Sequence, residues 1–213
     1  MARYNEAWLN DKTGEVHTPR ARMAYPTLLE AKKIKDKPDS KAKFSVTLLI
    51  PKAANVDLLK SKLVEALVEK FGKEWQKNKK LLFPLLKTVD QERLAEYADD
   101  YPLILRCSAN EGFPPFIYGP DAQQFKGQAS EIYPGRWATV AGKFFAYDNV
   151  SKGVNFGLNR IQLLEHDEPI AGGRVATSEG FETVNIGAPA GAVGDVKAAS
   201  ADDVFGGGDP IPF

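Results

Sequence analysis

Four segments rich in β-branched and aromatic residues follow one another from Tyr101 to about Leu164, and loops rich in turn-forming residues separate them. They read PLILRCSA, PPFIYG, RWATVAGKFFAYD and GVNFGLNRIQLLE. Short strands at this spacing are typical of β-sandwiches and β-barrels. Residues 149–153, Asn-Val-Ser-Lys-Gly, have the length of a hairpin connection and end in glycine. This part of the chain therefore predicts β-structure.

The preceding part adds two further strands. In FSVTLLIPK, residues 44–52, apolar side chains alternate on one face, which predicts a half-buried strand. The apolar positions are Phe44, Val46, Leu48 and Ile50. Residues 18–29 predict another strand, in which Pro26 requires a sheet edge, a bulge or a strand end because proline donates no ladder hydrogen bond.

Helices are expected between these early strands and the later ones. Residues 55–78 predict an amphipathic helix with Asn55 as its N-cap. Its apolar stripe, which we expect to serve packing, comprises Leu59, Leu63, Ala66, Leu67 and Phe71. Residues 88–91, Thr-Val-Asp-Gln, have capping-box spacing and predict a short second helix, QERLAEYA.

The fold class that best fits this order is mainly β with inserted helices, a partly open β-barrel of the oligonucleotide-binding (OB) type; a β-sandwich remains the alternative. We expect one domain over residues 1–170 and a flexible Gly/Ala-rich acidic tail over 171–213. Residues 175–213 carry six acids and one lysine, whereas the rest of the chain carries 27 bases and 22 acids. A basic body with an acidic tail predicts a polyanionic partner and a tail that imitates it.

The segment RWATVAGKFFAYD is the most informative for function. Alternation places Trp137, Thr139, Lys143, Phe145 and Tyr147 on one face, and an ordinary apolar core set on the other. Aromatic rings beside a cation provide stacking surfaces for nucleobases and neutralise phosphates without reading sequence. The structural alternative is that these rings pack under the tail or a helix.

Further cations and rings extend this prediction. Phe113, Phe116 and Tyr118 lie in a Pro-rich passage that either binds DNA or closes one end of a barrel. The complete set of DNA-binding candidates is Lys43, Phe113, Phe116, Tyr118, Lys126, Arg136, Trp137, Lys143, Phe145, Tyr147, Lys152 and Arg160. The expected partner is single-stranded DNA, with duplex DNA as an alternative and self-association left open.

Signatures of catalysis are missing from the sequence. The two histidines, His17 and His166, lie far apart and beside no cysteine pair, so no metal site is expected. No phosphate-cradling glycine loop is present, and we expect no cofactor. A metal-dependent nuclease built on loop acids such as Asp121 is the less favoured alternative. Cys107, the only cysteine, lies in an apolar run and is expected to be a buried thiol in a reducing cytoplasm. No apolar stretch approaches the length of a membrane span.

Residues 132–173 also carry a family resemblance. Tyr133-Pro134-Gly135, the aromatic strand after it, and Gly157-Leu158-Asn159 with Gln162 are similar to a bacteriophage family of single-stranded DNA-binding proteins. The resemblance is loose upstream of this region. It implies an OB-fold, binding without catalysis, and a role in phage replication or recombination.

The chain ends ADDVFGGGDPIPF, which resembles the acidic tip of bacterial single-stranded DNA-binding proteins. It departs from that tip by spreading its acids and by placing Pro210 before Ile211. The resemblance implies that the tail recruits replication or recombination proteins, and we expect it to compete with DNA for the basic body. The partner-binding candidates are Asp202, Asp203, Asp209, Ile211, Pro212 and Phe213.

Overall fold

A computed structural model describes residues 2–33 and 40–170 of the chain. The chain divides into two units, Met1–Val175 and Ala176–Phe213, and the description below concerns the first. The tail residues named above lie outside the described residues. In the described part, no helix combines the length and the apolar character needed to cross a membrane.

The first unit is mainly β, as expected. Its strands are β1 (Trp8–Asn10), β2 (Glu15–His17), β3 (Ala21–Lys32), β4 (Lys43–Ile50), β5 (Leu85–Lys87), β6 (Leu103–Asn110), β7 (Phe116–Tyr118), β8 (Trp137–Gly142), β9 (Phe144–Asp148), β10 (Lys152–Gly157) and β11 (Arg160–Leu163). One α-helix, α1 (Asp57–Phe71), joins β4 to β5. Short 3₁₀ turns occupy Ala2–Asn5, Trp75–Lys77, Thr88–Asp90, Ala95–Tyr97 and Ala129–Glu131.

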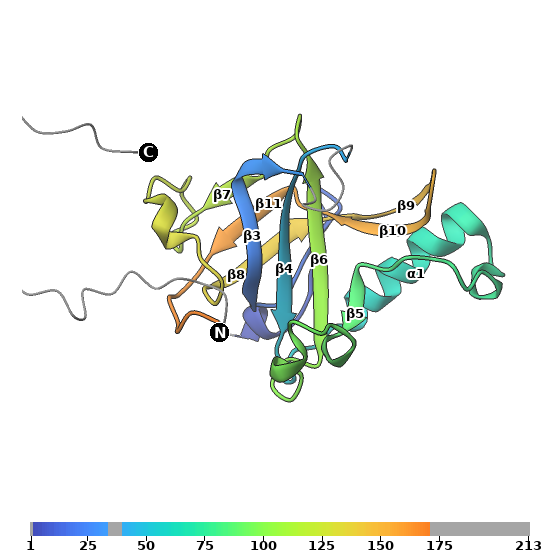
Figure 1. Ribbon diagram of the computed structural model, residues 1–213, viewed down its shortest axis with the longest axis horizontal. Coiled ribbons are helices and arrows are strands. Elements are labelled where there is room, and N and C mark those ends of the chain that lie inside the picture. The colour runs from blue at the N-terminus through green and yellow to red at the C-terminus, as the bar shows by residue number, and fades with distance from the viewer. Residues whose placement is uncertain (1, 34–39, 171–213) are drawn as a thin grey trace, which may run out of the picture. The chain divides into compact units, whose positions relative to one another are not determined.

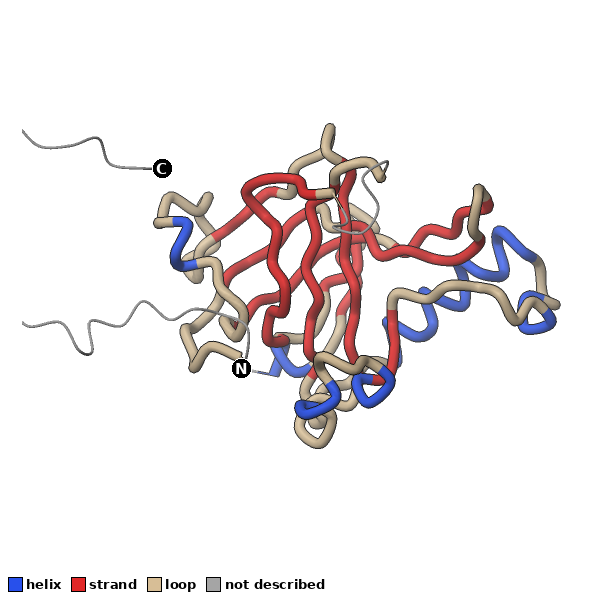
Figure 2. The backbone as a smooth tube through the Cα atoms, in the orientation of Figure 1, coloured by secondary structure: helices blue, strands red, loops and turns tan. Residues whose placement is uncertain are grey.

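The strands curl into a partly open barrel (Figure 2). The hydrogen-bonded order runs from β8 through β3, β4, β6 and β10 to β9. Because only Lys143 separates β8 from β9, this path returns to its start. The ring is closed by short ladders, since β3 meets β8 at two residue pairs and β6 meets β10, in parallel, at two. This is the OB-type architecture predicted from the sequence, and Figure 1 shows β3, β4 and β6 side by side with β8 and β11 behind them.

The barrel interior is filled by alternate residues of these strands. The predicted face of β4, Phe44, Val46, Leu48 and Ile50, is buried there. It packs with Met23 of β3, Leu105 of β6 and Phe156 of β10, each less than 1% exposed. The alternation prediction is therefore confirmed, and the intervening side chains of each strand lie on the outside of the barrel.

Helix α1 packs against the β9–β10 hairpin, at the right of Figure 1. Leu59, Ala66 and Leu67 are buried and Leu63 and Phe71 partly buried, so the predicted stripe is confirmed. The helix is shorter than predicted, and its N-cap is Val56 rather than Asn55. The Asn55 side chain still satisfies a helix-start donor, because its Oδ1 accepts a hydrogen bond from the Asp57 amide at 2.9 Å.

The prediction of a short helix over residues 91–98, QERLAEYA, is wrong. Residues 88–97 form successive 3₁₀ turns, in which the amides of Gln91, Leu94 and Tyr97 each donate to the carbonyl three residues before. No side-chain cap is made at Thr88, which is fully buried. The tighter turns place Leu94 in a small apolar cluster with Ile104, and this tertiary contact replaces the local capping preference.

Strand β3 is a central strand that pairs with β4 on one side and β8 on the other. Pro26 is accommodated by a register shift between Ala24 and Thr27, so the bulge is the alternative that the chain adopts. Tyr25 in this bulge has φ of 50°, a left-handed conformation uncommon outside glycine. Its side chain is 46% exposed although it belongs to a central strand.

Candidate nucleic-acid interface

The outside of β3, β4, β6 and β10 forms a polar surface, here called the outer face. It comprises Thr27, Ser45, Thr47, Arg106, Ser108 and Asn155, which alternate with core residues of the same strands. The side chains other than Arg106 are half-buried. Small hydroxyl and amide groups leave the sheet accessible, and OB-folds bind oligonucleotides on the corresponding strand face.

Hydrogen bonds and cross-strand pairs connect one row of this face across five strands. The Thr27 and Ser45 hydroxyl oxygens lie 2.8 Å apart, and Ser45 pairs with Ser108 on β6. Asn155 of β10 donates through Nδ2 to the Ser108 hydroxyl at 2.8 Å. Asn155 is in turn paired with Phe145 of β9, and directly opposed antiparallel residues project to the same side. The row therefore runs from Thr27 to an exposed aromatic ring.

Aromatic and apolar side chains flank the outer face on both sides. Tyr25 lies on the β3 side, and on the other side Phe145 is 49% exposed. Tyr147 lies two residues further along β9 and is half-buried. It pairs with Gly153 of β10, and Gly153 also forms an isolated β-bridge with the exposed Leu82. Phe144 and Ala146 point the opposite way and pack with α1. Exposed rings at both edges are the stacking surfaces that single-stranded nucleic acid uses.

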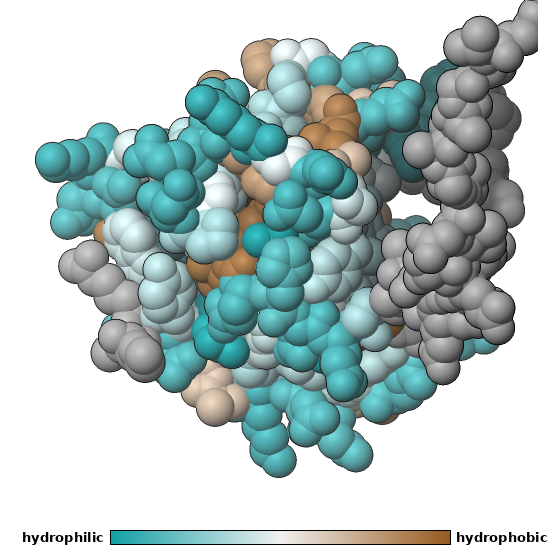
Figure 3. Space-filling model, turned by 90° about the vertical axis from the view of Figure 1, so that its left-hand side faces the viewer, coloured by the Kyte–Doolittle hydropathy of each residue, from teal (hydrophilic) through white to brown (hydrophobic). Residues whose placement is uncertain are grey.

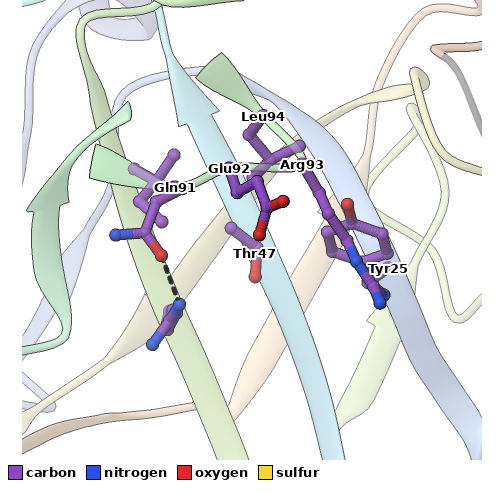
Figure 4. Close-up of a pocket in the computed structure, with 8 residues that line it drawn as sticks. Tyr25, Thr47, Gln91, Glu92, Arg93 and Leu94 are labelled. Atoms are coloured by element: carbon purple, nitrogen blue, oxygen red, sulfur yellow. Dashed lines mark hydrogen bonds between the residues drawn. The ribbon is translucent and has the colours of Figure 1, made fainter. Parts of the chain in front are cut away.

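Exposed cations lie around this surface. Lys43 begins β4, opposite Lys32 of β3. Arg106 projects from the outer face, and Arg93 reaches toward Tyr25 from the adjoining segment (Figure 4). Lys152 begins β10 and pairs with Asp148 at 2.9 Å. An exposed ion pair of this kind contributes little to stability, so the ammonium group remains able to exchange its carboxylate for a phosphate.

The single face predicted along residues 137–147 is divided by the barrel. Trp137 lies at the β3 end of β8, where the Arg20 guanidinium is 4.0 Å from its ring centroid and its indole donates to Asp167 Oδ2 at 2.7 Å. Thr139 lines a separate cavity, and Lys143 is exposed where β8 ends. Only Phe145 and Tyr147 of this face join the outer face.

The pKa of Asp167 beside Trp137 lies below its usual value. Partial desolvation raises this pKa, but hydrogen bonds from the Glu168 amide and the Trp137 indole, together with the charges of Arg22 and Arg20, lower it by more. The carboxylate is thereby kept ionised as an acceptor for the indole. Polar partners therefore hold the Trp137 ring on two sides, and these contacts favour a structural role for it.

The remaining predicted residues lie on other parts of the surface. Tyr118 and Arg160 line a cavity of about 260 Å³ beside β11, where Arg160 forms an ion pair with Glu15. Phe113 and Phe116 are exposed at an apolar groove, and Lys126 is exposed in the loop that follows β7. Figure 3 shows the side of the molecule that carries β7 and β11 as largely hydrophilic, with hydrophobic atoms visible between polar side chains. The structure does not bring these residues together with the outer face.

Arg136 requires a correction, because it is 2% exposed. Its Nε and Nη2 donate to the Leu164 carbonyl at 3.1 and 3.0 Å, and its Nη1 donates to the Glu131 carbonyl at 2.9 Å. A guanidinium enclosed in this way cannot reach a phosphate in this conformation. We therefore leave Arg136 out of the interface.

Several outer-face residues were missed by the sequence analysis. Ser45 and Thr47 lie between the predicted core positions of β4, and Arg106 and Ser108 flank Cys107, the residue of β6 that was expected to be buried. The sequence pattern could have identified them, because a strand with apolar residues on one face and hydroxyl residues on the other has one face that no other layer covers. Tyr25 carried no such signal, because its exposure follows from the bulge.

Within residues 2–33 and 40–170, no three His, Cys, Asp or Glu side chains gather closely enough to hold a metal ion. The Cys107 thiol is 1% exposed, and burial raises its pKa well above the usual range. The thiol is thus the inert buried group expected from the sequence.

Comparisons with known proteins agree with the architecture. The sequence model of the family described as Enterobacter phage Enc34, ssDNA-binding protein matches residues 14–190. A protein designated p50, from Acyrthosiphon pisum secondary endosymbiont phage 1, is 26% identical over 170 residues, which cover 78% of this chain and 91% of p50.

Solved structures show the same fold. The single-stranded DNA-binding protein of bacteriophage Enc34 in complex with ssDNA has a TM-score of 0.60 at 18% identity, covering 74% of this chain and 90% of that one. The bacteriophage T7 single-stranded DNA-binding protein gp2.5 has a TM-score of 0.51 at 12% identity, covering 74% and 95%. Since the family model spans most of the sequence, this chain belongs to the family of the single-stranded DNA-binding protein of Enterobacter phage Enc34.

Proposed function

We propose that this protein binds single-stranded DNA on its outer face without reading sequence along most of the strand. The observation that carries the proposal is a hydrogen-bonding sheet surface between the exposed rings of Tyr25 and Phe145. Bases stack on the rings, worth about 1–3 kcal/mol each, while cations at the rim neutralise phosphates. Membership of a family named for this activity supports the same conclusion.

Duplex DNA fits this surface less well. The faces of its bases are stacked inside the helix, so the rings at the edges of the outer face have no exposed base to contact. A single strand presents both its bases and its phosphates. The preference for single strands follows from the presence of aromatic rings as well as cations.

The test is fluorescence anisotropy with a labelled thymine oligonucleotide at several salt concentrations. Neutralisation of four phosphates by Lys43, Arg93, Arg106 and Lys152 gives a slope of about −2.8 in log K against log salt. An unlabelled duplex of equal length is the competitor, and it is expected to displace the strand poorly. Equal competition would favour an annealing or duplex-binding protein, and a flat salt dependence would contradict the electrostatic part of the proposal.

The acidic tail gives the proposal a regulatory part, supported by the sequence alone. Residues 175–213 carry six acids and one lysine, so this segment has the charge of a polyanion that could compete for a basic surface. We propose that it competes with DNA and, once displaced, offers Phe213 and its acids to replication or recombination proteins. Deleting residues 205–213 should strengthen single-strand affinity at low salt. Unchanged or weaker affinity would count against competition.

A further inference from the structure

A cavity of about 300 Å³ opens on the outer face between Tyr25 and the segment of residues 88–97. Figure 4 shows Tyr25 at one side, Thr47 on the strand beneath, and Gln91, Glu92 and Arg93 projecting from the opposite wall. Leu94 and Ile104, both buried, lie behind a lining that is otherwise polar apart from the Tyr25 ring. Convergent polar groups in a concave site fix the orientation of a bound ligand.

The backbone of Tyr25 supports a role for its ring. Its φ of 50° is unfavourable for a side chain of this size, and conformations of this kind persist where the surrounding structure imposes them and are concentrated at binding sites. The bulge that relieves Pro26 of ladder bonding also turns Tyr25 toward the cavity. A tyrosine ring that is 46% exposed there presents a face on which a base can stack.

The polar groups of the cavity differ in what they offer. Gln91 Oε1 accepts a hydrogen bond from Arg106 Nη2 at 2.6 Å, so the Gln91 amide group and the other Arg106 N–H groups remain as donors. Arg93 adds further donors, and Glu92 is the one carboxylate of the lining. A carboxylate pairs best with two adjacent N–H groups, and an arginine pairs with two adjacent acceptors.

Guanine is the nucleobase that matches this lining. It presents the adjacent acceptors O6 and N7, and its N1–H and N2–H₂ groups form a pair of adjacent donors. Adenine has no such pair of donors for Glu92, and cytosine and thymine have no N7 acceptor for an arginine. We propose that the cavity takes one base of the bound strand, stacked on Tyr25, and that its lining selects guanine.

This inference rests on the proposed function, since it assigns one position within the DNA-binding surface. The test uses the full chain and three oligonucleotides: all-thymine, thymine with isolated guanines at regular intervals, and the same strand with adenines in their place. The wild-type protein is expected to bind the guanine strand about fivefold more tightly than the adenine strand, the lower end of the range for a bidentate base contact.

Variants separate the two parts of the inference. Glu92→Gln should bring the guanine-to-adenine affinity ratio close to one, whereas Glu96→Gln, which removes the same charge from the same segment, should leave the ratio unchanged. Tyr25→Ala should weaken binding of all three strands by about tenfold. Tyr4→Ala, at another exposed tyrosine, should not, and Tyr25→Phe, which restores a ring, should recover most of the affinity lost in Tyr25→Ala.

Each outcome is decisive. An equal affinity of the wild-type protein for the guanine and adenine strands would overturn the selection of guanine, and full affinity in Tyr25→Ala would overturn the stacking site. Thermal unfolding of each variant shows whether a loss of affinity reflects loss of fold. If the wild-type protein failed to bind even the all-thymine strand, the proposed function itself would be wrong, which is a distinguishable result.

Discussion

Arg136 offers the sharpest test of whether a cation serves DNA or the fold. The replacement is Arg136→Met, which keeps much of the side-chain volume and removes the guanidinium. The sequence alone placed this arginine among the DNA-binding residues. The structure buries it and directs three hydrogen bonds from it to the carbonyls of Leu164 and Glu131. The two interpretations predict different measurements.

The expected loss of stability follows from those contacts. In the variant, two carbonyl groups lose their donors, and a buried polar group without a partner costs about 1–3 kcal/mol. Removing the guanidinium also removes the free energy of burying its charge, which offsets part of this loss. We expect a net destabilisation of about 3 kcal/mol. For a unit of this size that lowers Tm by about 6–12 °C.

The assay pairs thermal unfolding with single-strand affinity measured well below Tm. Arg136→Met should unfold at the lower temperature and bind a thymine strand as tightly as the wild type. Arg93→Met, at an exposed position, should show the opposite pattern, with an unchanged Tm and weaker binding. An Arg136→Met protein of normal Tm and reduced affinity would refute the structural role.

Three further predictions concern the body of the protein. Gly142→Ala should destabilise it by about 3 kcal/mol or more, because a Cβ would collide with the Gly157 carbonyl oxygen. Gly112→Ala, where nothing lies within 4 Å, is the control in thermal unfolding. Burial lowers the pKa of His17, so as the pH falls the unfolded chain binds a proton at a higher pH than the folded chain does. The free energy of unfolding should therefore be full above about pH 6.5 and fall below it. His17→Phe should weaken this pH dependence. The Cys107 thiol should react with a thiol reagent only after unfolding, since burial raises its pKa; rapid labelling of the native protein would contradict this.

The parts of the fold that the sequence predicted are those fixed by local periodicity. Phe44 and Val46 alternate with hydroxyl residues, and Leu59 and Leu67 recur at helical spacing. Burial of an apolar side chain stabilises by about 1.5–3 kcal/mol, more than a turn or cap contributes. Where many apolar residues recur at the spacing of a strand or a helix, the sequence predicts that strand or helix correctly. The capping-box pattern at Thr88 lacked this support, and the burial of Leu94 decided the conformation.

The site was harder to predict because accessibility depends on residues distant in the sequence. Arg136 immediately precedes β8 and carries a charge, yet the carbonyls that enclose it include that of Leu164, far along the chain. Tyr25 looks like an ordinary strand residue, yet the bulge before Thr27 exposes it. The spacing of residues in the sequence predicts neither the burial of Arg136 nor the exposure of Tyr25, because both arise from the packing of separate segments.

Barrel curvature explains why the face predicted along residues 137–147 does not act as one surface. Along a flat strand, alternate side chains share one plane, but β8 pairs with β3 and β9 pairs with β10, so the two halves lie on different sides of the barrel. A DNA strand that contacts both Tyr25 and Phe145 must therefore cross β3, β4, β6, β10 and β9. At about 4.8 Å between neighbouring strands, that path is about 19 Å long, and it follows the row of paired polar residues from Thr27 to Asn155. The direction of the bound strand is thus set by the order of the sheet, rather than by the sequence of the aromatic segment.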